Sequence, residues 1–84
     1  MKKITIYTGP MCNFCEAAKR LLIRNNFAYN EIDIGKVDGA MDDMIKKANG
    51  KRTIPQIFFD DQHIGGYDEV RALEKENKLK DLLK

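Results

Sequence analysis

Residues 3–22 decide the fold, and they read KITIYTGPMCNFCEAAKRLL. Residues 3–7 are rich in β-branched and aromatic side chains, which predicts a short strand that ends before the breaker pair Gly9-Pro10. Apolar residues then recur at helical spacing, at Phe14, Ala17, Ala18, Leu21 and Leu22. This spacing predicts a helix that ends near Asn25-Asn26, because Asn tolerates the left-handed conformation of a helix cap.

The rest of the chain continues the alternation of strands and helices. The same reasoning predicts a strand at residues 29–34, a helix that opens near Asp38 and closes at Asn49-Gly50, strands at residues 57–59 and 63–64, and a helix through Val70 and Leu73. Three leucines, Leu79, Leu82 and Leu83, either continue that last helix or begin a short fourth one.

The order strand–helix–strand–helix–strand–strand–helix predicts an α/β fold with a mixed four-stranded sheet and helices on both faces. A strand–helix–strand opening implies a parallel pair, and the close spacing of the last two strands implies an antiparallel hairpin. We expect a single domain over residues 1–84, because the length and the 43% hydrophobic content are those of one small globular domain. Ligands of such sheets sit beyond the carboxyl ends of strands, where Cys12 is placed.

Charge and hydropathy argue against two classes of partner. The formal net charge is +2, with both signs interspersed, so no basic block predicts a nucleic-acid partner. No apolar run approaches the ~20 residues of a membrane span, so no membrane partner is expected. The N-terminus lacks the apolar segment of an export signal, and we therefore expect a cytoplasmic protein with reduced thiols.

Both cysteines, Cys12 and Cys15, fall in one Cys-x-x-Cys unit at a predicted helix start. Backbone N–H groups and the dipole at a helix N-terminus favour a thiolate, the nucleophilic form of cysteine. We therefore interpret Cys12 as the attacking thiol and Cys15, one turn further in, as the resolving thiol.

Three structural alternatives stay open on the residues alone: cysteines that only pack, a structural disulfide and a structural zinc site. A stable disulfide is unusual in a reducing compartment. Zinc normally takes four ligands, and the chain offers only the two cysteines and a distant His63, which we interpret as structural or solvated. No metal ligand is therefore predicted.

Four stretches together resemble the glutaredoxins, most closely the bacterial glutaredoxin 3 type of the thioredoxin superfamily. They are residues 6–8 leading into Cys12-Asn13-Phe14-Cys15, residues 53–58, residues 63–66, and Asp68. The resemblance implies a thioredoxin-like fold and a glutathione-dependent thiol–disulfide oxidoreductase, with Cys12 and Cys15 catalytic and glutathione as co-substrate. It also implies a monomer whose partners are glutathionylated or disulfide-bonded proteins, with ribonucleotide reductase as one candidate.

The resemblance further implies a glutathione site made of Cys12, Phe14, Thr53, Ile54, Pro55, Gly66, Tyr67 and Asp68. Pro55 matches a family proline that follows a cis bond, and Ile54 would pair its backbone with bound glutathione. The Gly-Gly-x-Asp match implies a carboxylate held by backbone N–H groups and an ammonium group held by Asp68. On the residues alone, the same glycines are read as an ordinary helix start. Lys51 and Arg52 are weaker candidates for a second carboxylate.

The chain departs from the family pattern at four positions. Asn13 and Phe14 stand where the type motif has Pro and Tyr, and Gly9 stands where many relatives have a lysine that helps to hold the thiolate. Glu16 places a negative charge beside Cys15, which opposes thiolate formation. Relatives without the proline include carriers of a [2Fe–2S] cluster bridging two chains through Cys12-type thiolates and glutathione, which gives an alternative function. A third possible function is electron donation to ribonucleotide reductase, driven by thioredoxin reductase.

Overall fold

A computed structural model describes all 84 residues. The elements, in chain order, are β1 (Ile4–Thr8), α1 (Asn13–Arg24), β2 (Asn30–Asp33), α2 (Ala40–Lys47), β3 (Gln56–Phe59), β4 (Gln62–Gly65), α3 (Tyr67–Lys75) and α4 (Leu79–Leu83). The strands form one sheet in the order β2-β1-β3-β4. β1 is parallel to β2 and antiparallel to β3, and β3 is antiparallel to β4. The predicted mixed four-stranded sheet is thus confirmed.

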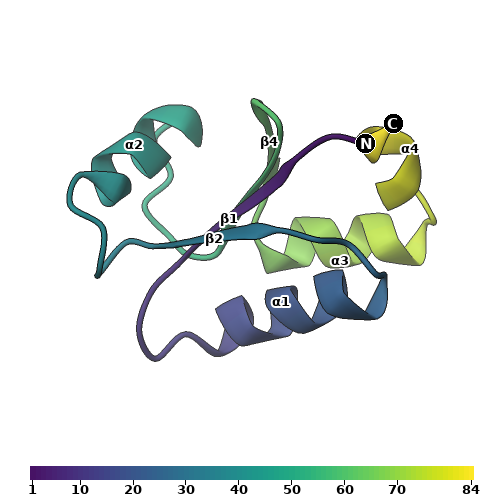
Figure 1. Cartoon of the computed structure of the whole chain (residues 1–84), viewed down its shortest axis with the longest axis horizontal. Helices are drawn as coiled ribbons and strands as arrows, with labels where there is room; N and C mark the ends of the chain where they lie inside the picture. Colours follow the sequence, from purple (N-terminus) through teal and green to yellow (C-terminus); the bar gives the residue numbers. More distant parts are fainter.

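Helices cover both faces of the sheet, with α1 and α3 on one face and α2 on the other (Figure 1). Alternate residues of β1 explain this, because successive side chains of a strand point to opposite faces. Ile4 and Ile6 join the larger core with side chains of α1, α3 and α4, whereas Tyr7 joins the smaller core with Met44 of α2 and with Ala48, which caps the end of α2. None of the four helices has both the length and the apolar character that crossing a membrane requires.

One predicted boundary needs correction, and one open alternative is decided. The second helix begins at Ala40 and not near Asp38, because Gly39 adopts a left-handed conformation (φ 77°) and caps the helix without a side-chain hydrogen bond. The end of this helix agrees with expectation, since Asn49 and the following glycine both have positive φ. The three C-terminal leucines form a separate helix, α4, because Asn77 interrupts the chain with φ 57°.

The topology brings three loops to one end of the sheet. The register pairs Tyr7, the last residue but one of β1, with Gln56 at the start of β3. It also pairs Ile57 of β3 with Gly65 at the end of β4. The loop before α1, the loop before β3 and the turn before α3 therefore meet, and the cysteine motif lies in the first of them.

Candidate active site

The cysteine pair lies at the first turn of α1. Cys12 caps this helix with an extended backbone (φ −114°, ψ 100°), and its Sγ accepts a hydrogen bond from the Cys15 backbone N–H at 3.1 Å. The two residues form a disulfide across a Cα–Cα distance of 5.2 Å. In the reduced protein, a backbone N–H in this position stabilises a thiolate relative to a thiol. Helix geometry therefore favours Cys12 as the nucleophile.

The two sulfurs differ in their access to solvent. Cys15 is only 1% exposed, whereas Cys12 is partly exposed and is flanked by the fully exposed Met11. Phe14, two residues after Cys12, is 62% exposed. An incoming thiolate or disulfide can therefore reach the Cys12 sulfur, while Cys15 can react only with its neighbour.

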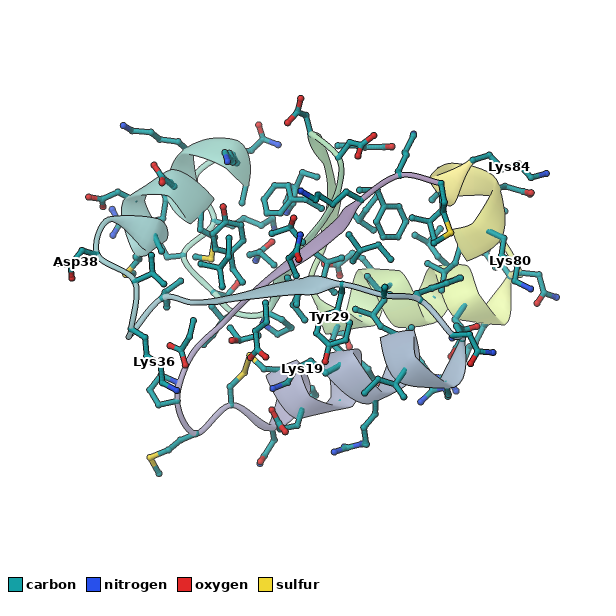
Figure 2. The ribbon with its side chains drawn as sticks, in the orientation of Figure 1. Lys19, Tyr29, Lys36, Asp38, Lys80 and Lys84 are labelled. Atoms are coloured by element: carbon teal, nitrogen blue, oxygen red, sulfur yellow. A yellow bond between two sulfur atoms is a disulfide. The ribbon has the colours of Figure 1, made fainter.

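The negative charge of Glu16 is paired. Lys19 lies one turn further along α1 (Figure 2) and places its Nζ 2.6 Å from the Glu16 carboxylate and 3.1 Å from that of Glu31. The hydrogen bond to Glu16, followed by that to Glu31, raises the pKa of Lys19. The Thr8 hydroxyl donates to Glu31 at 2.7 Å and is the main cause that lowers the pKa of that carboxyl. Glu16 is thus offset by a cation near Cys15.

The segment before β3 lies against the cysteine pair. The Ile54 carbonyl oxygen is 3.9 Å from Cys12 Sγ, and the Ile54–Pro55 peptide bond is cis. Gly9 explains part of this proximity, because a Cβ at that position would lie 2.7 Å from Ile54 Cδ1. At the position where many relatives have a lysine, this chain therefore has a glycine that lets the loop lie close to Ile54.

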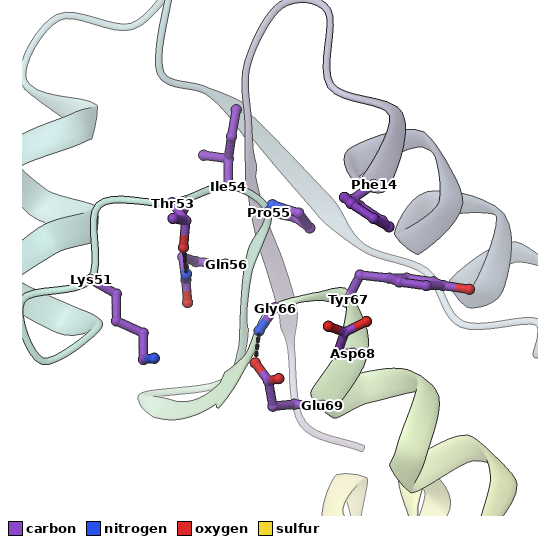
Figure 3. A pocket seen from close by; sticks show the side chains of 10 residues that line it. All are labelled: Phe14, Lys51, Thr53, Ile54, Pro55, Gln56, Gly66, Tyr67, Asp68 and Glu69. Carbon is purple, nitrogen blue, oxygen red and sulfur yellow. Dashed lines mark hydrogen bonds between the residues drawn. The ribbon is translucent and has the colours of Figure 1, made fainter.

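A groove of about 180 Å³ opens from this contact (Figure 3). Its walls come from α1, the loop before β3 and the start of α3, and its lining residues are Phe14, Lys51, Thr53, Ile54, Pro55, Gln56, Gly66, Tyr67, Asp68 and Glu69. All residues that the resemblance implied for glutathione binding line the groove, except Cys12, which contacts it at Ile54. Lys51 also lines the groove, whereas Arg52 does not.

The start of α3 forms one wall through close backbone packing. A Cβ on Gly66 would lie 3.2 Å from the Pro55 carbonyl oxygen, so glycine allows the two loops to approach. Tyr67 stacks on Phe14 with ring centroids 5.8 Å apart and an interplanar angle of 26°. This stack joins the wall made by α3 to the helix that carries the cysteines.

Two groove residues escaped the sequence analysis. Glu69 accepts a hydrogen bond from the Gly66 backbone N–H at 2.7 Å. The sequence pattern that indicates this contact is a Glu three residues after the Gly that precedes a helix. Gln56 is 2% exposed at the start of the most hydrophobic strand, and a polar side chain in such a strand signals a buried hydrogen-bond partner. His63 is one such hydrogen-bond partner, since its Nε2 lies 2.6 Å from Gln56 Oε1.

Charge is distributed unevenly along the groove. Lys51 lies on the side of Thr53, and Asp68 lies below Tyr67 on the other side (Figure 3). Both are exposed, as is Glu69. The groove can therefore take a ligand with an anionic group at one end and a cationic group at the other, with a sulfur near Cys12.

Comparisons with known proteins agree with this geometry. The sequence model of the family "Glutaredoxin" matches residues 4–64. A probable glutaredoxin of Synechocystis is 48% identical over 96% of this chain and 92% of its own length. Glutaredoxin 3 of Escherichia coli is 40% identical over the full length of both chains. The crystal structure of a buckwheat glutaredoxin–glutathione complex superimposes with a TM-score of 0.86 at 25% identity, over 98% of this chain and 76% of that one.

Proposed function

The chain belongs to the glutaredoxin family, and on this premise we propose that it reduces glutathione mixed disulfides and protein disulfides with glutathione as the reductant. Family membership accounts for a thioredoxin-like fold and for thiol–disulfide chemistry at the Cys12–Cys15 pair. The observation that supports the finer proposal is a groove with opposite charges at its two sides, next to the single accessible sulfur.

Glutathione has the chemistry that this groove favours. Its glycine carboxylate would face Lys51, and the ammonium group of its γ-glutamyl end would face Asp68. The Ile54 backbone, beside Cys12 Sγ, offers an N–H and a C=O to the cysteine backbone of the ligand in the manner of an added strand. The buckwheat relative was solved as a complex with glutathione, which supports the same ligand here.

The reaction follows from the access of the two sulfurs. In the reduced protein, the Cys12 thiolate attacks the glutathione sulfur of a mixed disulfide, and the S–S bond to the substrate breaks. The substrate leaves as a thiolate, and Cys12 holds glutathione in a new disulfide. A second glutathione thiolate then attacks the bound glutathione sulfur, which restores the Cys12 thiolate and releases glutathione disulfide.

The buried Cys15 provides a second route. Its thiolate attacks the Cys12 sulfur of the mixed disulfide, which releases glutathione and forms the Cys12–Cys15 disulfide seen in the structure. Glutathione then attacks the accessible Cys12 sulfur, and Cys15 leaves as the thiolate. A second glutathione attacks the bound glutathione sulfur, which restores the Cys12 thiolate and releases glutathione disulfide. The first route consumes one free glutathione, because the substrate provides the other half of the glutathione disulfide. In the second route two glutathiones supply the two electrons that reduce the Cys12–Cys15 disulfide.

The test is glutathione-coupled reduction of a glutathionylated peptide by the wild type, Cys12→Ser and Cys15→Ser. We expect no activity from Cys12→Ser and substantial activity from Cys15→Ser, because the first route does not use Cys15. Retained activity in Cys12→Ser would overturn the assignment of the nucleophile. Reduction by thioredoxin reductase, with none by glutathione, would instead identify a thioredoxin-like electron donor, of which ribonucleotide reductase is one acceptor.

A second candidate is a carrier of a [2Fe–2S] cluster, which the exposed Asn13 in place of proline favours. Such a cluster takes four thiolate ligands, and one chain offers a single accessible cysteine. The residues of one chain do not suffice, so two chains and two glutathiones would be needed. Anaerobic reconstitution with iron, sulfide and glutathione should then give a brown dimer; a colourless monomer would exclude this function.

A further inference from the structure

The Gln56 side chain is a buried amide with partners on both sides. Its Nε2 donates to the Thr53 carbonyl oxygen at 3.0 Å and to Thr53 Oγ1 at 3.1 Å, and its Oε1 lies 2.6 Å from His63 Nε2. Figure 3 shows the contact between Gln56 and Thr53 below the Ile54–Pro55 segment. With 2% exposure, Gln56 has almost no access to water as an alternative partner.

The network has only one favourable orientation. If the amide were reversed, Gln56 Oε1 would face the Thr53 carbonyl oxygen, and two acceptors would oppose each other within 3.0 Å. In the orientation observed, Gln56 Oε1 accepts, so His63 must carry a proton on Nε2 and donate it. The neutral Nε2–H tautomer and the imidazolium both meet this requirement.

From this network we propose that His63 and Gln56 are positioning residues for the active site. His63 fixes the Gln56 amide, Gln56 holds Thr53, and Thr53 holds the segment that places the Ile54 backbone beside Cys12. Thr53 Oγ1 accepts from Gln56, which leaves the Thr53 hydroxyl proton free to donate to a ligand in the groove. The inference rests on the proposed function, since it assigns these residues to binding of the glutathionylated substrate.

The groups that face His63 are consistent with a donor role. Its ring packs on Phe58 with centroids 5.1 Å apart, which fixes the ring plane. Burial, followed by the charge of Lys51, lowers the pKa of His63, while Glu69 acts in the opposite direction. His63 is therefore favoured in its neutral form near pH 7, and Gln56 selects the Nε2–H tautomer of that form.

The first experiment measures the tautomer of His63 in the reduced wild type by ¹⁵N-detected NMR of the imidazole at pH 8. We expect the proton on Nε2. A dominant Nδ1–H tautomer would overturn the proposal, and this result does not depend on which substrate the enzyme uses.

The second experiment compares the kinetics of His63→Phe, His63→Gln and Gln56→Glu on a glutathionylated peptide. His63→Phe keeps an aromatic ring against Phe58 but removes the donor, and Gln56→Glu keeps shape but turns a carboxylate oxygen towards the Thr53 carbonyl. We expect KM to rise about fivefold in both, with kcat within about twofold, because a lost positioning hydrogen bond weakens binding in ground and transition states alike. His63→Gln, which again offers an N–H, should return KM to within about twofold of the wild type.

Alkylation of Cys12 by iodoacetamide is the internal control. A rate within about twofold of the wild type in all variants shows that a raised KM arises from substrate binding and not from the Cys12 thiolate. Wild-type KM in both His63→Phe and Gln56→Glu would overturn the positioning role, and so would failure of His63→Gln to rescue a raised KM. If the wild type does not use glutathione at all, the proposed function fails, whereas the tautomer measurement still decides the orientation of the network.

Discussion

Substitution of Gly65 by Ala should test how the groove wall is built. Gly65 ends β4 with φ 132°, a region that favours glycine. A Cβ there would lie 2.6 Å from Glu69 Oε1, 2.7 Å from Glu69 Cγ and 2.9 Å from Glu69 Cβ. Rotation of the side chain cannot relieve the contact with Cβ, so either Glu69 and the start of α3 or the end of β4 must move.

The size of the effect follows from three costs. Positive φ costs a non-glycine residue about 1–2 kcal/mol, and forcing atoms into a filled space costs about 1–3 kcal/mol. Displacement of Glu69 also weakens its hydrogen bond to the Gly66 N–H, worth about 1 kcal/mol. Together these costs predict a loss of roughly 3–6 kcal/mol in the free energy of unfolding.

A matched control separates backbone strain from collision. Gly39 also has positive φ (77°), but a Cβ there would meet nothing within 4 Å, so Gly39→Ala should cost only about 1–2 kcal/mol. Urea unfolding followed by circular dichroism measures both variants. Glu69→Ala added to Gly65→Ala should recover only about 1 kcal/mol, because it removes the contacts with Glu69 Oε1 and Cγ but keeps the contact with Cβ. Equal destabilisation by Gly65→Ala and Gly39→Ala would refute the reasoning.

Three further predictions concern charge and access. Thr8→Val removes the hydroxyl that lowers the pKa of Glu31 from its ordinary value of 4.5, and should cost about 0.5–1 kcal/mol at pH 7 because that carboxylate is partly exposed. Since the native carboxyl binds its proton more weakly than the unfolded one, this stabilisation is present above pH 4.5 and is lost as the pH falls through the lowered native pKa. The urea unfolding curves of wild type and variant should therefore converge at that low pH, and curves that stay apart would contradict the prediction. Phe14→Ala should lower the free energy of unfolding by less than about 1 kcal/mol, because the ring is 62% exposed. The same substitution should raise KM for a glutathionylated peptide about threefold, and an unchanged KM would show that the ring does not contact the substrate. Asp68→Asn should raise the same KM about threefold to tenfold at low salt and less at 0.5 M salt, with Asp42→Asn on α2 as the control; an effect independent of salt would argue against charge recognition.

The sequence predicted the sheet well because hydrophobic periodicity is a local signal. The alternation at Ile4 and Ile6 and the spacing of Leu21 and Leu22 reflect faces that the fold buries. Boundaries were less predictable. Asp38 is the better cap by side-chain chemistry, yet the left-handed turn at Gly39 decides where α2 begins.

The site was predictable only in part from physical reasoning. A cysteine at a helix start indicates a stabilised thiolate, so the role of Cys12 as nucleophile could be predicted from the motif. The glycines before α3 read equally well as a plain helix start, and only the resemblance to a family assigned them to a ligand. The pairing of Gln56 with His63 was not predictable, because it depends on an irregular register between β3 and β4 next to Ile57.

The order of the chain has a consequence for its synthesis. Cys12 and Ile54 are 42 residues apart, and they meet only when β3 pairs with β1. At a translation rate of ~5–20 residues per second, Cys12 leaves the ribosome roughly 2–8 seconds before Ile54, and longer before the groove residues of α3. During that interval the nascent chain carries an ordinary dithiol that can react with any oxidant or disulfide nearby. Pairing of β1 with β3 therefore brings Ile54, and with it one wall of the groove, beside a thiol that until then had no such neighbour.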